Sequence, residues 1–241
     1  NYDFRENTGF TTLKGAETLN LISSKNSISR VKYIKSNAIL IEKNKINQAF
    51  YAFTDFVDRM LMFFSLDGTG YQGFLTGSDS FTQGIIREGK TKEFEKFLRD
   101  NDIVYNLVEK DFNGTKELFC HFENGDVLFS SIASTGTRAL ALFYYWYIKL
   151  SRVSLVYIDE YDAFYHFELS KKLIELLKTL HKTQVIVTSH NTDLLSNDLL
   201  RPDCYYNIND NQIKTFSQLT NKDIRKAHNI QKMYKAGSFN E

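Results

Sequence analysis

Residues 155–160 read Leu-Val-Tyr-Ile-Asp-Glu, and residues 185–190 read Val-Ile-Val-Thr-Ser-His. Each stretch is a short run of apolar, mostly β-branched residues that ends in polar side chains, which predicts a strand running into a loop. Leucines at helical spacing in residues 169–180 predict a helix between the two strands. A strand, a helix and a second strand in this order predict parallel strands covered on both faces, so we expect this half of the chain to be α/β.

Residues 138–150 come before these strands and are apolar almost all round, which predicts a buried helix. The rest is expected to form a helical and antiparallel-β lobe. Its expected elements are strands in residues 31–34 and 38–41, helices in residues 44–64 and 92–101, a glycine-rich break in residues 67–84, and a hairpin from residues 118–122 to 127–129 with Asn124-Gly125 as a type I′ turn. We divide the chain into residues 1–114, strand-rich and then helical, and residues 115–241, the α/β half.

The composition is that of a soluble globular protein. Thirty Lys and Arg residues against 29 Asp and Glu residues leave a net charge of +1, and 42% of the residues are apolar. This balance gives no overall electrostatic reason to bind nucleic acid or an anionic membrane, although it does not exclude a local basic patch. Two cysteines are too few for a disulfide framework, and no apolar stretch reaches the roughly 20 residues of a membrane span. We expect a cytoplasmic protein.

Polar side chains follow both predicted strands, at the edge where open parallel sheets bind ligands. Asp159 and Glu160 end the first strand, and adjacent carboxylates can divide the work, one holding Mg²⁺ and the other polarising an attacking water. Ser189 and His190 end the second strand, where an imidazole can contact a phosphate oxygen. Each feature also has a simpler interpretation, as the loop that leaves a strand or as a strand-end histidine.

A hydroxyl-rich turn precedes the buried helix. It consists of Ser134, Thr135, Gly136 and Thr137. Hydroxyls and free backbone N–H groups at a helix N-terminus can bind an anion, although such a stretch is first of all an N-cap. The turn, the strand end at Asp159 and the strand end at His190 resemble, in order and separation, the signature motif, Walker B motif and switch histidine of ABC-class ATPases.

The resemblance narrows to the soluble bacterial ATPases of abortive infection and phage defence. Residues 159–162 with His166, residues 189–195 and the tail at residues 225–239 are similar to segments of that group. The resemblance covers residues 115–241 well and the earlier part loosely. It implies the C-terminal portion of such an ATPase, with part of the sheet of a P-loop NTPase of the ABC head type.

The resemblance also implies a role for each motif residue. Asp159 would organise Mg²⁺, Glu160 would act on the hydrolytic water, and His190, with Ser189 beside it, would sense the γ-phosphate of ATP. The hydroxyl-rich turn would cap the γ-phosphate of ATP bound to a second subunit, which implies a head-to-tail homodimer with ATP between the protomers. The turn departs from the common Leu-Ser-Gly-Gly-Gln signature at Thr135 and Thr137.

Two glycine-rich patterns are not expected to bind nucleotide. Residues 84–91 match G-x-x-x-x-G-K-[ST], but no apolar strand precedes them and residues 85–87 are bulky where backbone must wrap around phosphate, so we expect a surface turn. Residues 68–73 match G-x-G-x-x-G but follow a predicted helix, which indicates a flexible connection. The resemblance implies a Walker A loop upstream of these residues, and because the chain opens at Asn1 in a strand-like stretch, we expect it to be the later part of a longer ATPase.

Other functions stay open. ATP could act only as a signal in a non-hydrolysing regulatory module. Asp159, Glu160 and Asp162 could hold metals in a nuclease, although the strand before them fits nucleotide hydrolysis better. A structural-maintenance type head would need long heptad repeats, which the sequence lacks. In the favoured interpretation, the ATPase switches a partner protein or an effector in anti-phage defence.

Overall fold

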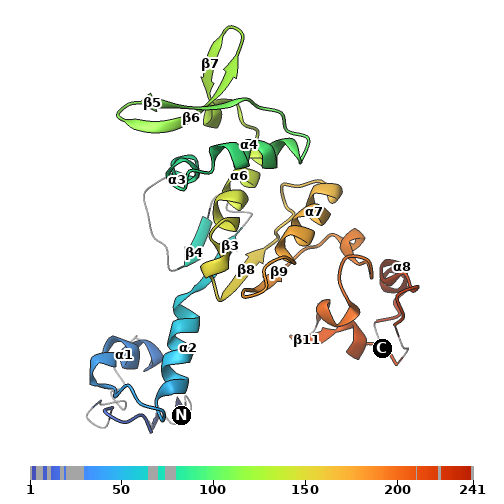
Figure 1. Ribbon diagram of the computed structural model, residues 1–241. Coiled ribbons are helices and arrows are strands. Elements are labelled where there is room, and N and C mark those ends of the chain that lie inside the picture. Colours follow the sequence, from blue (N-terminus) through green and yellow to red (C-terminus); the bar gives the residue numbers. More distant parts are fainter. Residues whose placement is uncertain are drawn as a thin grey trace. The chain divides into compact units, whose positions relative to one another are not determined.

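The computed structural model describes residues 2–3, 8–9, 12–16, 19, 30–64, 70–73, 80–209, 211–221 and 224–239. Contacts divide the chain into two units, Asn1–Met60 and Leu61–Glu241, and each is described by itself (Figure 1). The predicted division after residue 114 falls inside the second unit, in the turn between two strands. As a functional division it stays a prediction.

The first unit contains short elements around a buried asparagine. Its elements are β1 (Tyr2–Asp3), β2 (Thr8–Gly9), α1 (Arg30–Ser36), the 3-10 turn η1 (Ala38–Leu40) and α2 (Gln48–Asp58). The fully buried Asn47 side chain donates to the carbonyls of Lys14 and Glu42 and accepts the Lys14 N–H. These bonds hold the start of α2 to the loop before it and to the earlier segment at Lys14.

Both strands predicted from apolar runs in this unit are wrong. Residues 31–34 belong to α1, and residues 38–41 form η1 and the residue that ends it. The Asn37 side-chain amide donates to the Tyr33 carbonyl four residues back, at 2.8 Å. A polar side chain that satisfies a helix-end carbonyl favours a helix here. The short apolar runs by themselves gave no indication of this hydrogen bond.

The predicted helix at residues 44–64 is confirmed only in part. Helix α2 ends at Asp58, and strand β3 (Met60–Phe64) follows, with burial that alternates along it. A run of five apolar residues fits the period of a strand as well as that of a helix, so the pattern could not show where the helix stops. The apolar side chains before β3 also lie largely outside a core, because Phe53 is 51% exposed and Ile46 is 61% exposed, whereas Leu61 in β3 is fully buried.

The second unit contains an α/β sheet. In the part of the chain that the structure describes, β3, β4 (Gly70–Gly73), β8 (Leu155–Asp159) and β9 (Gln184–Val187) lie in the order β4-β3-β8-β9. Strands β8 and β9 are parallel, which confirms the prediction, whereas β3 and β4 are antiparallel. The sheet is therefore mixed, with an antiparallel hairpin on one side of the parallel pair.

Helices α6 (Thr135–Tyr147) and α7 (Phe167–Leu177), both predicted, share the core of this sheet. Trp146 of α6 packs edge-on against Phe63 of β3 with ring centroids 5.7 Å apart, and Leu177 of α7 belongs to the same buried cluster. Val156 and Ile158 of β8 are buried in this cluster, and their neighbours along the strand are half-buried. The described residues thus cover one face of β8 more fully than the other.

Helices and an antiparallel sheet form the lobe that the sequence predicted. Its elements are α3 (Phe81–Arg87), α4 (Thr91–Arg99), β5 (Leu107–Phe112), β6 (Thr115–Phe122), β7 (Gly125–Leu128) and α5 (Phe129–Ile132). Leu118 and Cys120 of β6 share a buried cluster with Phe94 and Leu98 of α4. Helix α4 confirms the helix predicted at residues 92–101, and this cluster shows which face of it is buried.

The predicted hairpin at residues 118–129 is confirmed, but its turn differs from the prediction. Gly125 already pairs with Phe122, so the turn lies before Gly125 rather than on it. The Asn-Gly pair with two positive φ angles lies instead between β5 and β6, where Asn113 has φ +51° and Gly114 has φ +82°. These are the backbone angles of a type I′ turn, which Asn-Gly adopts readily.

Neither glycine-rich pattern forms a nucleotide loop. Residues 84–87 complete α3, and Lys90 is the N-cap residue of α4, so the G-x-x-x-x-G-K-[ST] match is the junction of two helices. Its rejection as a phosphate loop is confirmed, but the surface turn expected there is wrong for residues 84–87, which are helical, with Gly84 and Ile85 buried. The other pattern follows strand β3, not a helix, and Gly70–Gly73 pair with β3 as strand β4. The expected flexible connection is therefore wrong for these described residues.

The C-terminal part has a small core of its own. Its elements are η4 (Thr192–Leu194), η5 (Pro202–Cys204), β10 (Tyr206–Asn209), β11 (Gln212–Thr215), η6 (Phe216–Gln218) and α8 (Ile230–Lys235); η3 (Leu150–Arg152) lies earlier, after α6. Tyr205, Phe216, Ile230 and Phe239 form the buried cluster, and the rings of Phe216 and Phe239 stack with centroids 4.6 Å apart.

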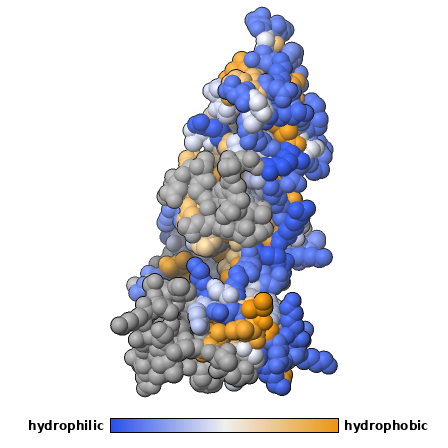
Figure 2. All heavy atoms as spheres, turned by 90° about the vertical axis from the view of Figure 1, so that its left-hand side faces the viewer, coloured by the Kyte–Doolittle hydropathy of each residue, from blue (hydrophilic) through white to orange (hydrophobic). Residues whose placement is uncertain are grey.

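The described helices include none with the length and apolar character needed to cross a bilayer. Figure 2 shows a face of the molecule on which hydrophilic residues predominate and hydrophobic residues form smaller areas between them. The exposed apolar side chains include Ile39 in η1 and the cross-strand neighbours Ile208 and Ile213 in β10 and β11.

Candidate functional site

The carboxyl ends of β8 and β9 lie at one edge of the sheet. Asp159 is the last residue of β8 and Glu160 follows it, whereas β9 ends at Val187 and Thr188 follows. Because the strands are parallel with Ile158 opposite Val187, Asp159 and Thr188 come next to each other. The Thr188 N–H donates to the Ile158 carbonyl at 3.0 Å, which extends the pairing by one step.

Thr188 connects the two acids. Its hydroxyl donates to Asp159 Oδ1 at 2.8 Å and accepts the Glu160 N–H at 2.8 Å. The Tyr157 hydroxyl also donates to Asp159 Oδ1, at 3.2 Å, and burial together with the Asp159 carboxylate raises the pKa of Tyr157. Two hydroxyl groups therefore hold one oxygen of Asp159, and within the described residues the other oxygen has no hydrogen-bond donor.

Glu160 has a strained backbone and lies beside His190. Its φ of +45° is a left-handed conformation that residues other than glycine rarely adopt. Glu160 Oε1 lies 3.5 Å from Nε2 of His190, and the His190 side chain is 92% exposed. The turn at the end of β8 thus places a carboxylate next to an imidazole that an incoming ligand can reach.

Ser189 links this edge to the loop after β8. Its hydroxyl donates to Asp162 Oδ2 at 2.8 Å and accepts the Asn191 N–H at 2.9 Å. The Asn191 side chain in turn accepts the Asp193 N–H at 3.0 Å and caps η4. Ser189 uses its hydroxyl within the protein in this way, and its predicted contact with nucleotide stays a prediction.

The hydroxyl-rich turn forms the start of α6. The Ser134 hydroxyl accepts the Thr137 N–H at 3.1 Å and lies 2.9 Å from the Thr137 hydroxyl, so Ser134 is the N-cap. Thr137 is buried, whereas Ser134 and Thr135 are exposed. Gly136 faces the loop after β8, because a Cβ at this position would lie 3.1 Å from the carbonyl oxygen of Phe164.

The structure brings Asp159, Glu160 and His190 together and leaves the hydroxyl-rich turn outside their contacts. Among the described residues, no hydrogen bond or ion pair joins the turn to these three side chains. A turn that serves a nucleotide on a second copy of the chain needs no such contact. The roles predicted for the four turn residues, which involve a second copy, stay predictions.

The donor set at the strand ends fits Mg²⁺ shared with phosphate. Mg²⁺ takes hard oxygen ligands, typically one or two carboxylates, with water and phosphate oxygens for the rest. Asp159 offers such a carboxylate oxygen, and in the described residues no group of three His, Cys, Asp or Glu side chains could hold a metal by itself. The nuclease alternative would use Asp162 as a further ligand; its Oδ2 accepts the Ser189 hydroxyl, and this alternative stays a prediction.

Thr188 and Tyr157 are site residues to which the sequence predictions assigned no role. A signal for Tyr157 was present, because it lies two residues before Asp159 and so shares a strand face with it. Thr188 is a hydroxyl residue directly after a predicted strand. The partner of its hydroxyl depends on the pairing of β8 with β9, which the sequence does not show.

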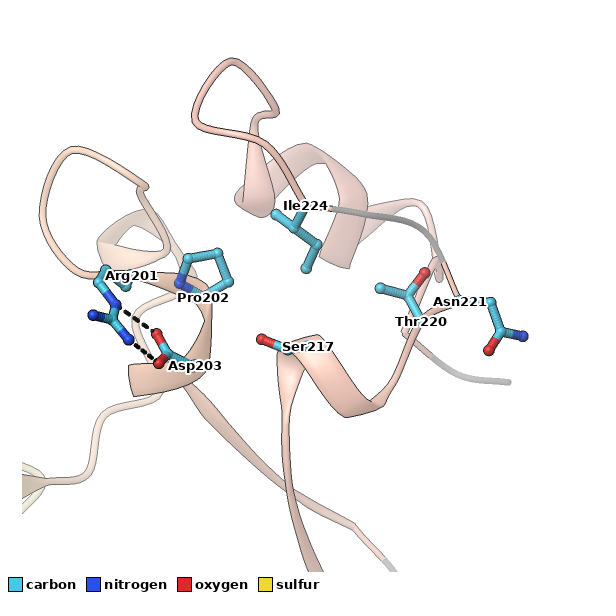
Figure 3. A pocket seen from close by; sticks show the side chains of 7 residues that line it. All are labelled: Arg201, Pro202, Asp203, Ser217, Thr220, Asn221 and Ile224. Atoms are coloured by element: carbon cyan, nitrogen blue, oxygen red, sulfur yellow. Dashed lines mark hydrogen bonds and ion pairs between the residues drawn. The ribbon is translucent and has the colours of Figure 1, made fainter.

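A separate cavity of about 480 Å³ lies in the C-terminal part (Figure 3). It is lined by Arg201, Pro202, Asp203, Ser217, Thr220, Asn221 and Ile224. Arg201 Nε donates to Asp203 Oδ1 at 2.9 Å, and hydrogen bonding to Arg201 holds the pKa of Asp203 below its usual value. None of the predicted site residues lines this cavity.

Residues 18–196 match the family described as "AAA domain, putative AbiEii toxin, Type IV TA system". The chain belongs to this family. The matched part of this AAA domain contains the hydroxyl-rich turn and both strand ends, and the family supports the nucleotide-binding ATPase class and the abortive-infection group that the motifs resembled. ATP and Mg²⁺ are the usual ligands of such domains. A search of curated proteins found no match.

Proposed function

We propose that this AAA domain hydrolyses ATP as an ABC-class head, with ATP held between two copies in a head-to-tail dimer. The junction at Thr188 carries the proposal, because there Asp159 and Glu160 share one hydroxyl at the carboxyl edge of the sheet. His190 lies 3.5 Å from Glu160 at the same edge. This is the edge at which open α/β sheets bind ligands, and the family match supports ATP as the ligand.

Each side chain has one task in this proposal. Asp159 would hold Mg²⁺, Glu160 would accept a proton from the attacking water, and His190 would contact the γ-phosphate. Bound Mg²⁺ would neutralise charge on the phosphate oxygens. The hydroxyl-rich turn of the second copy would bind the γ-phosphate with its hydroxyls and with N–H groups at the start of α6.

We also propose that the ATP-driven change of the dimer switches a partner protein or an effector in abortive infection. The description of the family, which names a toxin of a toxin–antitoxin system, supports a protein partner. A toxin of such a system is controlled by a second component. In this proposal that component would bind one of the two states of the ATP-dependent dimer and not the other.

Glu160→Gln tests hydrolysis in the complete gene product. Glutamine has nearly the same size but cannot accept the proton, so we expect kcat to fall by about 10²-fold, with ATP still bound and ATP-containing dimers accumulating. Phosphate release and light scattering measure the two effects. Glu168→Gln, an exposed glutamate in the first turn of α7, is the matched control and should change neither. Undiminished phosphate release in Glu160→Gln would mean that Glu160 is not the catalytic base, and ATP binding without phosphate release by the wild-type protein would mean that ATP acts only as a signal.

A further inference from the structure

The imidazole of His190 has few contacts of its own. Its side chain is 92% exposed, and its ion-pair partner in the described residues is Glu160 at 3.5 Å. The position of such a side chain depends on the backbone on either side. Strand β9 holds the backbone before His190, and residues 191–196 must hold the backbone after it.

Tyr205 closes the turn at the far end of that segment. The single proton of its hydroxyl is shared between the carbonyls of Leu194 and Ser196, each at 2.8 Å, and the hydroxyl accepts the Ser196 N–H at 3.1 Å. The Tyr205 ring is buried in the C-terminal core, beside Phe216 and Ile230. A buried hydroxyl with three backbone contacts fixes this turn more firmly than a solvent-exposed contact could.

The same turn is anchored in two hydrophobic cores. Leu194 is buried in the core of the sheet, with Val156 and Ile158 of β8, whereas the next residue, Leu195, packs against the C-terminal core. Consecutive residues that point into different cores leave the backbone little freedom. The C-terminal core therefore reaches the sheet through this turn.

Hydrogen bonds carry this restraint back to His190. The Asn191 N–H donates to the Ser189 hydroxyl, and Asn191 accepts the N–H groups of Asp193 and Leu194, so hydrogen bonds connect Leu194 to the residue before His190. Helix α8 adds an exposed contact, because the side chains of Gln231 and Lys235 both reach Asp193. A shift of Leu194 would thus shift the segment that carries His190.

We propose that Tyr205 is a positioning residue, through which the C-terminal core holds His190 at the nucleotide edge of the sheet. The proposal rests on the function proposed above for His190. Tyr205 itself lies beyond residue 196, where the family match ends. The C-terminal core then contributes to catalysis without touching ATP.

Tyr205→Phe tests the proposal, because it keeps the ring and removes the hydroxyl. In nucleotide-free protein we expect amide hydrogen exchange of residues 189–196 to rise on the order of tenfold, while exchange in α6 and β8 stays unchanged. Tyr206→Phe is the matched control, since Tyr206 is 62% exposed and adjacent in sequence. Unchanged exchange in residues 189–196 overturns the proposal, and so does a rise spread evenly over the whole unit.

Steady-state kinetics give the second readout. We expect Tyr205→Phe to lower kcat on the order of tenfold with KM unchanged, as for a misplaced catalytic group. If Glu160→Gln abolishes hydrolysis and Tyr205→Phe leaves kcat intact, the positioning role is wrong and the ATPase assignment stands. If the wild-type protein hydrolyses no ATP, the ATPase assignment fails, and the exchange result alone decides whether Tyr205 holds the segment.

A second variant covers the case in which Tyr205→Phe does not fold. Asp193→Asn weakens the exposed contact with α8 and leaves both cores intact. Exchange of residues 189–194 should rise several-fold above that of the wild-type protein. Asp198→Asn, an exposed aspartate of the same loop, is its control. If residues 189–194 exchange equally fast in Asp193→Asn and Asp198→Asn, the proposal that the C-terminal core holds this segment is contradicted.

Discussion

The Thr188 hydroxyl stands between two carboxylate residues whose backbones differ. Asp159 ends an extended strand, and Glu160, at φ +45°, begins a left-handed turn. A non-glycine residue in this region costs about 1–3 kcal/mol, which the surroundings must offset. The bond from the Glu160 N–H to Thr188 is one such offset, and the same hydroxyl orients Asp159.

Replacing Thr188 by valine should therefore disturb both acids. Valine has nearly the same shape but leaves the Glu160 N–H without its acceptor, so we expect a loss of about 1–3 kcal/mol in the free energy of unfolding. We also expect a fall in kcat on the order of tenfold. Urea denaturation and phosphate release measure the two effects. Thr188→Ser keeps the hydroxyl and should restore most of both, and a serine variant as impaired as the valine variant would contradict this account.

Among the elements, α4 and β5 are joined by one carboxylate. Glu95 of α4 accepts the N–H of Leu107, the first residue of β5, at 2.7 Å, and lies 3.2 Å from Lys92 and 3.3 Å from Arg99. Burial opposes ionisation of Glu95, but these contacts outweigh it and lower the pKa. The bond satisfies a strand-end N–H that the pairing of β5 with β6 leaves to another acceptor.

Stability should depend on pH through Glu95. Because its pKa is lower in the folded than in the unfolded state, the carboxylate adds stability above the unfolded pKa, and this is lost as pH falls through the folded pKa. We expect Glu95→Gln to lower the free energy of unfolding by about 1 kcal/mol near neutral pH. Urea denaturation at a series of pH values should show the difference from wild type shrinking below about pH 4. A difference that stays constant with pH would mean that the charge does not matter.

For the whole molecule, the proposed dimer makes each ATP site depend on two chains. One chain supplies Asp159, Glu160 and His190, and the other supplies the hydroxyl-rich turn. In the described residues these two sets make no hydrogen bond or ion pair within one chain. A defect in either set should then be complemented by a partner that carries the other defect.

Mixing two inactive variants tests this dependence. Ser134→Asp keeps an N-cap residue at the start of α6 but places a negative charge against phosphate, so by itself it should be inactive. Mixed with Glu160→Gln, it forms heterodimers that have one intact site, so an equal mixture should recover about a quarter of wild-type phosphate release. A mixture as inactive as its components would argue against an ATP site made by two chains.

Much of the α/β half could be predicted from local pattern. Strands β8 and β9 and helices α6 and α7 were expected because β-branched runs and leucines at helical spacing are signals within a few residues. The strand-end acids and the cap at Ser134 were found in the same way. The pattern failed where one short apolar run fits two structures, as at the end of α2 and the start of β3.

Contacts between distant residues decided the rest. Strand β3 lies beside β8, although the two are remote in sequence. The partners of the Thr188 hydroxyl follow from strand pairing, and Tyr205 bonds to residues 194 and 196 across a loop. The residue type determines which hydrogen bonds a side chain can make. Which partner it meets depends on how strands and helices pack, and this information lies in the packing of the whole unit rather than in any one stretch of chain.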